Sequence, residues 1–126
     1  MLDHLRQHIA TILAPTQSVT LASFGAAGLQ AHLCLCVARD LHVYVLLPST
    51  SDHLLNLESD QLVVLIAAGW HVRGRARVLG AAQRHAAGAL LNAPDAPWSV
   101  VVDVEPMRVT IAQREGWGAA ETIDLD

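Results

Sequence analysis

The sequence predicts a mainly β protein, a small antiparallel barrel of six or seven strands with flanking helices. Between residues 18 and 113, most of the chain alternates apolar residues with small or polar ones, the period of two that is typical of strands. Turn-forming residues separate these runs at short intervals. Gly74 and Ala76 occupy inward positions of one run, and such small side chains allow a narrow barrel to close.

Length and composition are those of one soluble globular domain, which we place at residues 1–126. The chain is 52% hydrophobic and 16% charged, and no apolar run approaches the roughly 20 residues that span a bilayer. The N-terminus lacks a secretory signal, so the expected location is cytoplasmic. The net charge is −4 and there is no basic run, which argues against nucleic acid or an anionic membrane as a partner.

The first half of the chain is expected to form a helix and a three-stranded meander. Apolar residues at helical spacing predict an N-terminal helix within residues 1–15, which Pro15 ends. The runs "SVTLASF", "LQAHLCLCV" and "LHVYVLL" are expected strands, separated by "GAAG" and "RD" turns. In the second strand we expect the leucine-rich face to be the core face and the face with His32, Cys34 and Cys36 to be semi-polar.

The second half is expected to complete the barrel over residues 18–113, with helices near 52–59 and 81–92. The apolar run "QLVVLIAA" predicts a strand, and "HVRGRARVL" predicts another with its valines, Gly74 and Ala76 inward and its arginines outward. The segment 81–92 is alanine-rich, which favours an α-helix. Strands follow in "WSVVVDV" and "RVTIA", with a break expected at Pro106, and residues 114–126 are expected to be a C-terminal tail.

The stretch "LPSTSDHLLNLESD" allows two interpretations of its hydroxyl cluster. Ser51 suits the N-cap of the helix that follows, and Asp52 in the first turn favours the positive end of the helix dipole. The same hydroxyls and free backbone N–H groups are also suited to a phosphate, with His53 as a nearby ring that carries charge when protonated.

The two cysteines are not expected to form a disulfide or a metal site. Cys34 and Cys36 are too far apart along an extended strand to bridge, and they lack the spacing of zinc ligands. His32 stands beside them, so zinc remains the minority interpretation, and packing in the core or at an interface is preferred. No metal is therefore predicted.

The order of these elements resembles the FMN-binding split-barrel proteins, the pyridoxamine 5'-phosphate oxidase-like superfamily. The resemblance covers most of the chain, and its most specific part is "LHVYVLLPSTSDHLLNLESDQLVVLI", similar to the family's strand, Ser-x-Lys turn and "NL" helix. It implies a split β-barrel homodimer that holds FMN at the subunit interface. In this family the Ser-x-Lys turn and a polar or basic residue on the second strand bind the phosphate.

Carried over to this chain, the family pattern names five cofactor-binding positions. Ser51 stands at the serine and His53 at the lysine of the turn, and His32 lies near the second-strand position. The backbone groups of Leu46 and Leu47 would lie near the flavin ring.

Arg73 is the sixth expected cofactor-binding residue. It belongs to an outward arginine stripe, which is most often a solvated strand face, but in a split-barrel dimer such a face meets the partner subunit or the cofactor phosphate. Arg73 is nearest the strand start and Trp70. Trp70 and Trp117 are candidates to cover a planar ring, with packing as the alternative.

The resemblance implies an FMN-dependent oxidoreductase that transfers a hydride at the flavin and acts on a small molecule. No catalytic motif that works without a cofactor is present, so any chemistry would belong to the cofactor. One alternative is a heme-binding or heme-handling protein, suggested by seven histidines and by "REGWGAA", which is similar to a tail in heme-binding relatives. Another is a cofactor-free dimeric module with a degenerate flavin site, because neither phosphate position is Lys or Arg.

Overall fold

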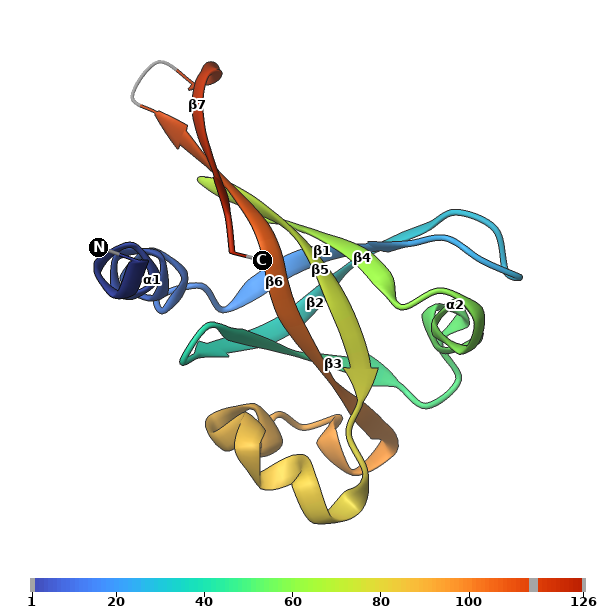
Figure 1. Ribbon diagram of the computed structural model, residues 1–126. Coiled ribbons are helices and arrows are strands. Elements are labelled where there is room, and N and C mark those ends of the chain that lie inside the picture. Colours follow the sequence, from blue (N-terminus) through green and yellow to red (C-terminus); the bar gives the residue numbers. More distant parts are fainter. Residues whose placement is uncertain (1, 114–115, 126) are drawn as a thin grey trace.

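The computed structural model describes residues 2–113 and 116–125, and it shows a mainly β chain with short flanking helices (Figure 1). The helical elements are α1 Leu2–Leu13, α2 Asp52–Ser59, and the 3₁₀ segments η1 Ala81–Asn92 and η2 Ala96–Trp98. The strands are β1 Ser18–Ser23, β2 Gln30–Arg39, β3 His42–Pro48, β4 Leu62–Ile66, β5 Trp70–Val78, β6 Ser99–Gln113 and β7 Gly116–Asp124.

Six strands close into an antiparallel barrel, and the seventh extends it. The strand order is β3-β2-β1-β4-β5-β6-β7, and a further pairing of β3 with β6 closes the barrel. The predicted fold class is therefore confirmed. The segment expected as a tail contributes β7, which pairs with β6 from Arg108↔Asp124 to Gln113↔Gly116. Among the described residues, no helix is long and apolar enough to cross a membrane.

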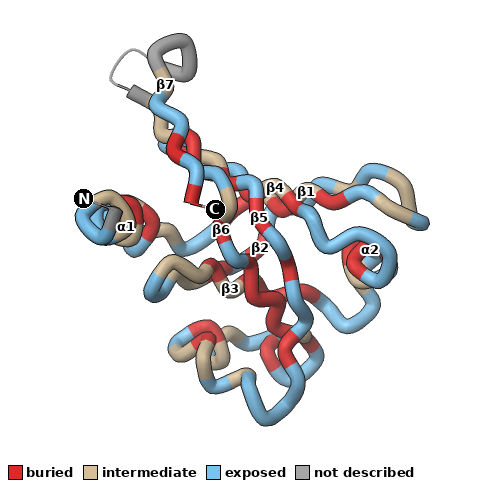
Figure 2. Tube along the Cα trace, in the orientation of Figure 1, coloured by how far each residue is buried: buried red, intermediate tan, exposed pale blue. Residues whose placement is uncertain are grey.

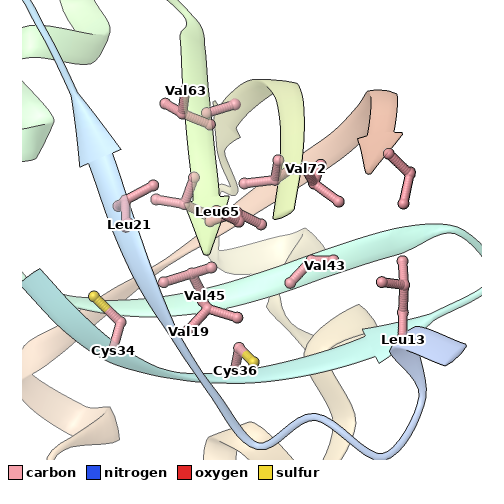
Figure 3. Close-up of a cluster of buried hydrophobic side chains, with 14 of the residues drawn as sticks. Leu13, Val19, Leu21, Cys34, Cys36, Val43, Val45, Val63, Leu65 and Val72 are labelled. Carbon is pink, nitrogen blue, oxygen red and sulfur yellow. The ribbon is translucent and has the colours of Figure 1, made fainter. Parts of the chain in front are cut away.

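The barrel interior is an apolar core built from alternate residues of the strands. Figure 2 shows buried residues concentrated where the strands cross, and Figure 3 shows their side chains pointing toward one another. Val19, Leu21, Val43, Val45 and Leu65 are each at most 1% exposed. Helix α1 packs against this core through Ile9 and Leu13, as its apolar spacing predicts.

Strand β2 presents the opposite face to the core from the one expected. Cys34 and Cys36 are buried among the core valines (Figure 3), whereas Leu29 and Leu33 are each 74% exposed and Leu35 is 51% exposed. Alternation defines two faces of a strand but does not say which one points inward. Here the smaller thiols occupy the barrel interior, and the larger leucines form an exposed apolar face.

Strand β6 runs unbroken through Pro106, where a break was expected. Its pairing with β5 passes from Arg73↔Arg108 to Gly74↔Pro106, so Met107 is an extra residue in a β-bulge. A bulge tolerates proline because one residue leaves the regular hydrogen-bond ladder there. A Cβ on Gly74 would lie 2.8 Å from the carbonyl oxygen of Glu105, which explains the glycine opposite Pro106.

The alanine-rich segment 81–92 is a kinked 3₁₀ segment and not the expected α-helix. Gly88 has φ 54° and ψ −122°, a conformation outside the helical region, and it interrupts the segment. Ala87 and Leu90 of η1 cover Leu46 and Val101 on the outside of β3 and β6, forming a second, smaller apolar cluster.

Val78, expected to face inward, is 45% exposed at the end of β5.

Candidate functional site

A cavity of about 550 Å³ lies beside the N-terminus of α2, a volume suited to a small organic ligand. Strand β2, the end of β3 and the turn before α2 form most of its wall, and Asp95 and Ser99 complete it. Five of the six predicted site residues line this cavity: His32, Leu46, Leu47, Ser51 and His53. Their apolar and polar side chains come from three different elements, which the barrel brings together.

Ser51 caps α2, as the first interpretation of the hydroxyl cluster predicts. It has extended backbone angles, and its Oγ accepts a hydrogen bond of 3.2 Å from the backbone N–H of His53. The cap leaves the Ser51 hydroxyl proton free to donate into the cavity. The hydroxyl of Thr50 lies in the same wall, so capping and anion binding are compatible at this turn.

His53 is a buried link between the core and the cavity. Its side chain is among the largest fully buried ones, with 1% of the residue exposed. Its Nδ1 lies 2.6 Å from Ser23 Oγ, and its Nε2 lies 3.0 Å from Nδ1 of His32. The two imidazole rings meet edge to face, with centroids 5.1 Å apart.

Asn56 anchors the inner end of this chain of contacts. It is completely buried on α2, and its Nδ2 donates to Ser23 Oγ at 3.0 Å and to the Gly28 carbonyl at 2.9 Å. Its Oδ1 accepts from the backbone N–H of Ala27 at 2.8 Å. The side chain therefore joins α2 to β1 and to the β1–β2 turn. A Cβ on Gly25 in that turn would lie 2.9 Å from the Asn56 Cα, so the turn packs directly on this residue.

The environment of His53 favours its neutral form. Burial lowers the pKa of His53, the nearby His32 lowers it further, and Asp52 opposes both effects. Because both ring nitrogens already have partners, His53 does not offer a free cation to a phosphate. Its predicted contact with a cofactor stays a prediction, but the positive charge of the family's lysine is not reproduced here.

Lysine and arginine are absent from the described wall of the cavity, which instead includes the carboxyl groups of Asp52 and Asp95. Arg73 lies elsewhere, beside a second cavity of about 170 Å³ that Phe24 and Leu29 also line. One chain therefore does not bring Arg73 together with the other five predicted residues.

The outer face of the β2-β1-β4 sheet is apolar and exposed. Strand pairing places Leu33, Thr20 and Ile66 in one row across the three strands. On the neighbouring strand β5, Arg73 pairs with Val64 of β4. We call this the apolar face and define it by its exposed large residues: Phe24, Leu29, Leu33, Leu35, Leu62 and Ile66. Leu33 and Leu35 also line the larger cavity, so the cavity opens onto the apolar face.

Of the two tryptophan candidates from the sequence, only the side chain of Trp70 is described, and it does not line the cavity. Trp70 is 3% exposed, and its Nε1 donates to Thr16 Oγ1 at 3.2 Å, so it packs in the barrel. The side chain of Trp117 and residues 114–115 of "REGWGAA" lie outside the described part of the molecule. No cluster of metal-ligating side chains occurs within residues 2–113 and 116–125.

Sequence reasoning missed Ser23 and Asn56. Ser23 contacts both His53 and Asn56, and about 30 residues of sequence separate it from each of them. A local sequence pattern cannot predict contacts between residues so far apart in the chain. The available signal is a single polar residue in an otherwise apolar stretch, Asn56 within "HLLNL" and Ser23 at the end of "VTLAS". Such residues are buried only when they are hydrogen-bonded.

No family model matches the sequence, and no curated protein is significantly similar to it. Solved structures do share its fold. A Clostridium acetobutylicum protein related to general stress protein 26, of the pyridoxinephosphate oxidase family, has a TM-score of 0.70 at 12% identity over 97% of this chain and 94% of that one.

Two other proteins of similar structure are named for the ligand that they bind. A FAD-binding protein from Mesorhizobium loti has a TM-score of 0.64 at 16% identity, covering 82% of this chain and 88% of that one. A heme binding protein from Mycobacterium smegmatis has a TM-score of 0.69 at 19% identity, covering 94% of this chain and 57% of that one. The chain thus has the split-barrel fold of the pyridoxamine 5'-phosphate oxidase-like proteins, as its sequence suggested.

Proposed function

We propose that this protein is a homodimeric flavoprotein, which binds FMN in the cavity beside α2 and uses it as an oxidoreductase. The observation that carries the proposal is the position of the cavity, which combines a capped helix start with an opening onto an exposed apolar face. Proteins of the same fold include one named as FAD-binding and one of the pyridoxinephosphate oxidase family, which supports a flavin.

The cavity fits the flavin better than it fits the phosphate. Leu35, Leu46 and Leu47 supply apolar wall for a planar ring, and the hydroxyls of Thr50 and Ser51 supply donors for a phosphate. Asp52 and Asp95 oppose an anion, and the described wall has no arginine to offset them. FMN binding therefore needs a cation from outside the described wall of the cavity.

A second subunit is the natural source of that cation. Large exposed apolar patches on small proteins mark interaction sites, and a two-fold dimer places the same face of each subunit against the other. The apolar face includes two residues of the cavity wall, Leu33 and Leu35, and Arg73 lies in the neighbouring strand. We infer that Arg73 of the partner subunit completes the phosphate site.

Bound FMN would supply hydride transfer with a small-molecule substrate. The residues of this chain would bind and orient it. Ser51 and Thr50 would donate hydrogen bonds, the backbone of Leu46 and Leu47 would lie along the ring, and His32 would offer a ring nitrogen at the wall. The dimer contact would exclude water from the apolar side of the cavity.

The proposal is tested by titrating the purified protein with FMN and following flavin fluorescence, with mass by light scattering. We expect a dimer that binds FMN. Arg73→Gln should weaken binding roughly 10- to 100-fold, the effect of about 1.5–3 kcal/mol for a charge-assisted hydrogen bond. Arg75→Gln is the matched control, because Arg75 is also exposed on β5 but does not line either of these two cavities. It should leave the affinity unchanged.

The dimer is tested separately by Ile66→Asp, which places a charge on the apolar face without touching the cavity wall. We expect a monomer that no longer binds FMN. A wild-type protein that stays monomeric at micromolar concentration would contradict the dimer. A dimer that does not bind FMN would contradict the flavin and favour the cofactor-free module.

Heme is the second candidate, favoured by one observation. The exposed His32 ring lies at the cavity wall next to Leu33 and Leu35, and one similar structure is named as a heme binding protein. A Soret band that depends on His32 after hemin addition would support this alternative.

A further inference from the structure

The hydrogen bonds that join Asn56, Ser23, His53 and His32 have a fixed direction. The direction starts at Asn56, because its amide orientation is set by two backbone groups. The Ala27 N–H can only donate and lies 2.8 Å from Oδ1, whereas the Gly28 carbonyl can only accept and lies 2.9 Å from Nδ2. The second proton of Nδ2 therefore points to Ser23 Oγ.

The direction passes from Ser23 to His53. Ser23 is 3% exposed, and within the described chain its hydroxyl has two side-chain partners, Asn56 and His53. Asn56 donates to the oxygen, so the hydroxyl proton has only Nδ1 of His53 to bond to. Nδ1 of His53 is then an acceptor, and the neutral ring carries its proton on Nε2.

The direction ends at His32. The Nε2–H of His53 donates to Nδ1 of His32 across 3.0 Å, so a neutral His32 also carries its proton on Nε2. That nitrogen has no hydrogen-bond partner among the described residues, and the ring lines the cavity. The chain of contacts thus presents one N–H donor at the cavity wall.

We propose that Asn56, Ser23 and His53 are positioning residues that fix His32 as a hydrogen-bond donor, so that the cavity selects a ligand with an acceptor atom over a metal centre. The acceptor is an oxygen or ring nitrogen of the kind that a flavin or a phosphate carries. A metal would need the lone pair of His32 Nε2, which is the nitrogen that these hydrogen bonds keep protonated. The identity of the acceptor ligand as FMN rests on the function proposed above.

Reversing the direction would leave a buried group unsatisfied. If His32 donated from Nδ1, Nε2 of His53 would have to accept and its Nδ1 would have to donate to Ser23 Oγ. The Ser23 hydroxyl proton would then have no acceptor in a buried site, which opposes the reversal. Removal of that hydroxyl should remove the preference and leave the two imidazole rings free to take either tautomer.

The tautomers are measured in the ligand-free protein by long-range ¹H–¹⁵N correlation spectra of the histidine rings at pH 8. We expect His32 and His53 both to be protonated on Nε2. Ser23→Ala should give a mixture of tautomers at His32, whereas Ser18→Ala, at the exposed start of the same strand, should not. A wild-type spectrum with either ring protonated on Nδ1 would overturn the proposal, and this reading requires no variant to fold.

Ligand selection is measured with hemin and FMN as probes. Wild type should bind hemin without a His32-ligated spectrum, or not at all, and Ser23→Ala should gain His32-dependent affinity of roughly tenfold. His32-ligated hemin in wild type would overturn the inference. Absence of FMN binding together with the expected tautomers would overturn the flavin function alone, and FMN binding together with the opposite tautomers would overturn the inference alone.

Discussion

Two histidine networks on different elements of the barrel show how a hydrogen-bond partner sets which ring nitrogen of an imidazole carries the proton. At the cavity, His53 lies between the Ser23 hydroxyl and His32 and has only neutral hydrogen-bond partners. On the outer surface of β3, Nδ1 of His42 lies 2.7 Å from the Asp103 carboxylate, which also accepts from Arg77 at 3.3 Å.

The two networks place the proton on different ring nitrogens. A carboxylate only accepts, so His42 must donate from Nδ1, whereas Nδ1 of His53 accepts from a hydroxyl. The His42 network is a charged tie between β3, β5 and β6, and its ring also stacks on Tyr44 with centroids 6.0 Å apart. A buried carboxylate thus ties a histidine into a structural network on the barrel surface, whereas a hydroxyl and a second imidazole make it a directional link to a cavity.

The largest expected effect comes from Asn56→Ala, which removes the origin of the neutral network. The N–H of Ala27, the carbonyl of Gly28 and the Ser23 hydroxyl would each lose a partner. The bond to Ser23 is buried and the other two are part-buried. A lost partner costs about 1–3 kcal/mol when the group is buried and less when it is part-buried, so we expect the free energy of unfolding to fall by about 3 kcal/mol. Urea denaturation measures this, with Asn92→Ala at an exposed position as the control. Equal stability of the two variants would contradict the anchoring role.

A smaller effect is expected in the charged network from Asp103→Asn. Asp103 is 6% exposed and accepts from both His42 and Arg77, so the change should destabilise the protein by about 2 kcal/mol. Arg77→Ala should cost less than about 1 kcal/mol, because that side chain is 63% exposed and screened by solvent. A double-mutant cycle separates the two terms. If Arg77→Ala lowered the free energy of unfolding as much as Asp103→Asn does, the ion pair with Arg77 would dominate this network, and not the hydrogen bonding of the buried carboxylate.

The smallest change is expected in the pH dependence that His53 imparts to stability. Its pKa is lowered in the folded state, so the unfolded chain takes up the proton first as the pH falls. The stabilising contribution is complete above the ordinary histidine pKa of about 6.5 and is lost as the pH falls from there toward the lowered folded value. His53→Gln should show a shallower loss of stability between pH 7.5 and 5.5 than wild type. His8→Gln, at an exposed position of α1, should match wild type; a His53→Gln slope equal to wild type would contradict the neutral network.

Local patterns in the sequence predicted the elements that depend on neighbours along the chain. The Ser51 cap, the start of α2 at Asp52 and the alternation of β5 up to Ala76 are all present. Patterns failed where the outcome depends on distant contacts. The inward face of β2 depends on what the barrel can hold, and Pro106 is accommodated because Gly74 and a bulge lie opposite.

The candidate site follows the same division. Its wall was predictable in part, because five of the expected residues lie at one helix start and at three positions on two strands. The direction of the network was not, because it arises from Asn56 and Ser23, which the fold brings to His53 from separate elements. Arg73 lines a separate cavity, and only the proposed dimer would bring it to the first one, an arrangement that the pattern of a single chain does not specify.

The inward-facing cysteines of β2 give the barrel a built-in chemical reporter. Cys34 and Cys36 are free thiols, each less than 9% exposed (Figure 3), and burial followed by the influence of Cys34 raises the pKa of Cys36 to about 12. Thiolates are the reactive form, so the native molecule holds both sulfurs in an inert state. Cys34 also lines the cavity, whereas Cys36 does not. Alkylation of Cys36 therefore requires the strands to separate, and its rate measures how often the closed barrel opens.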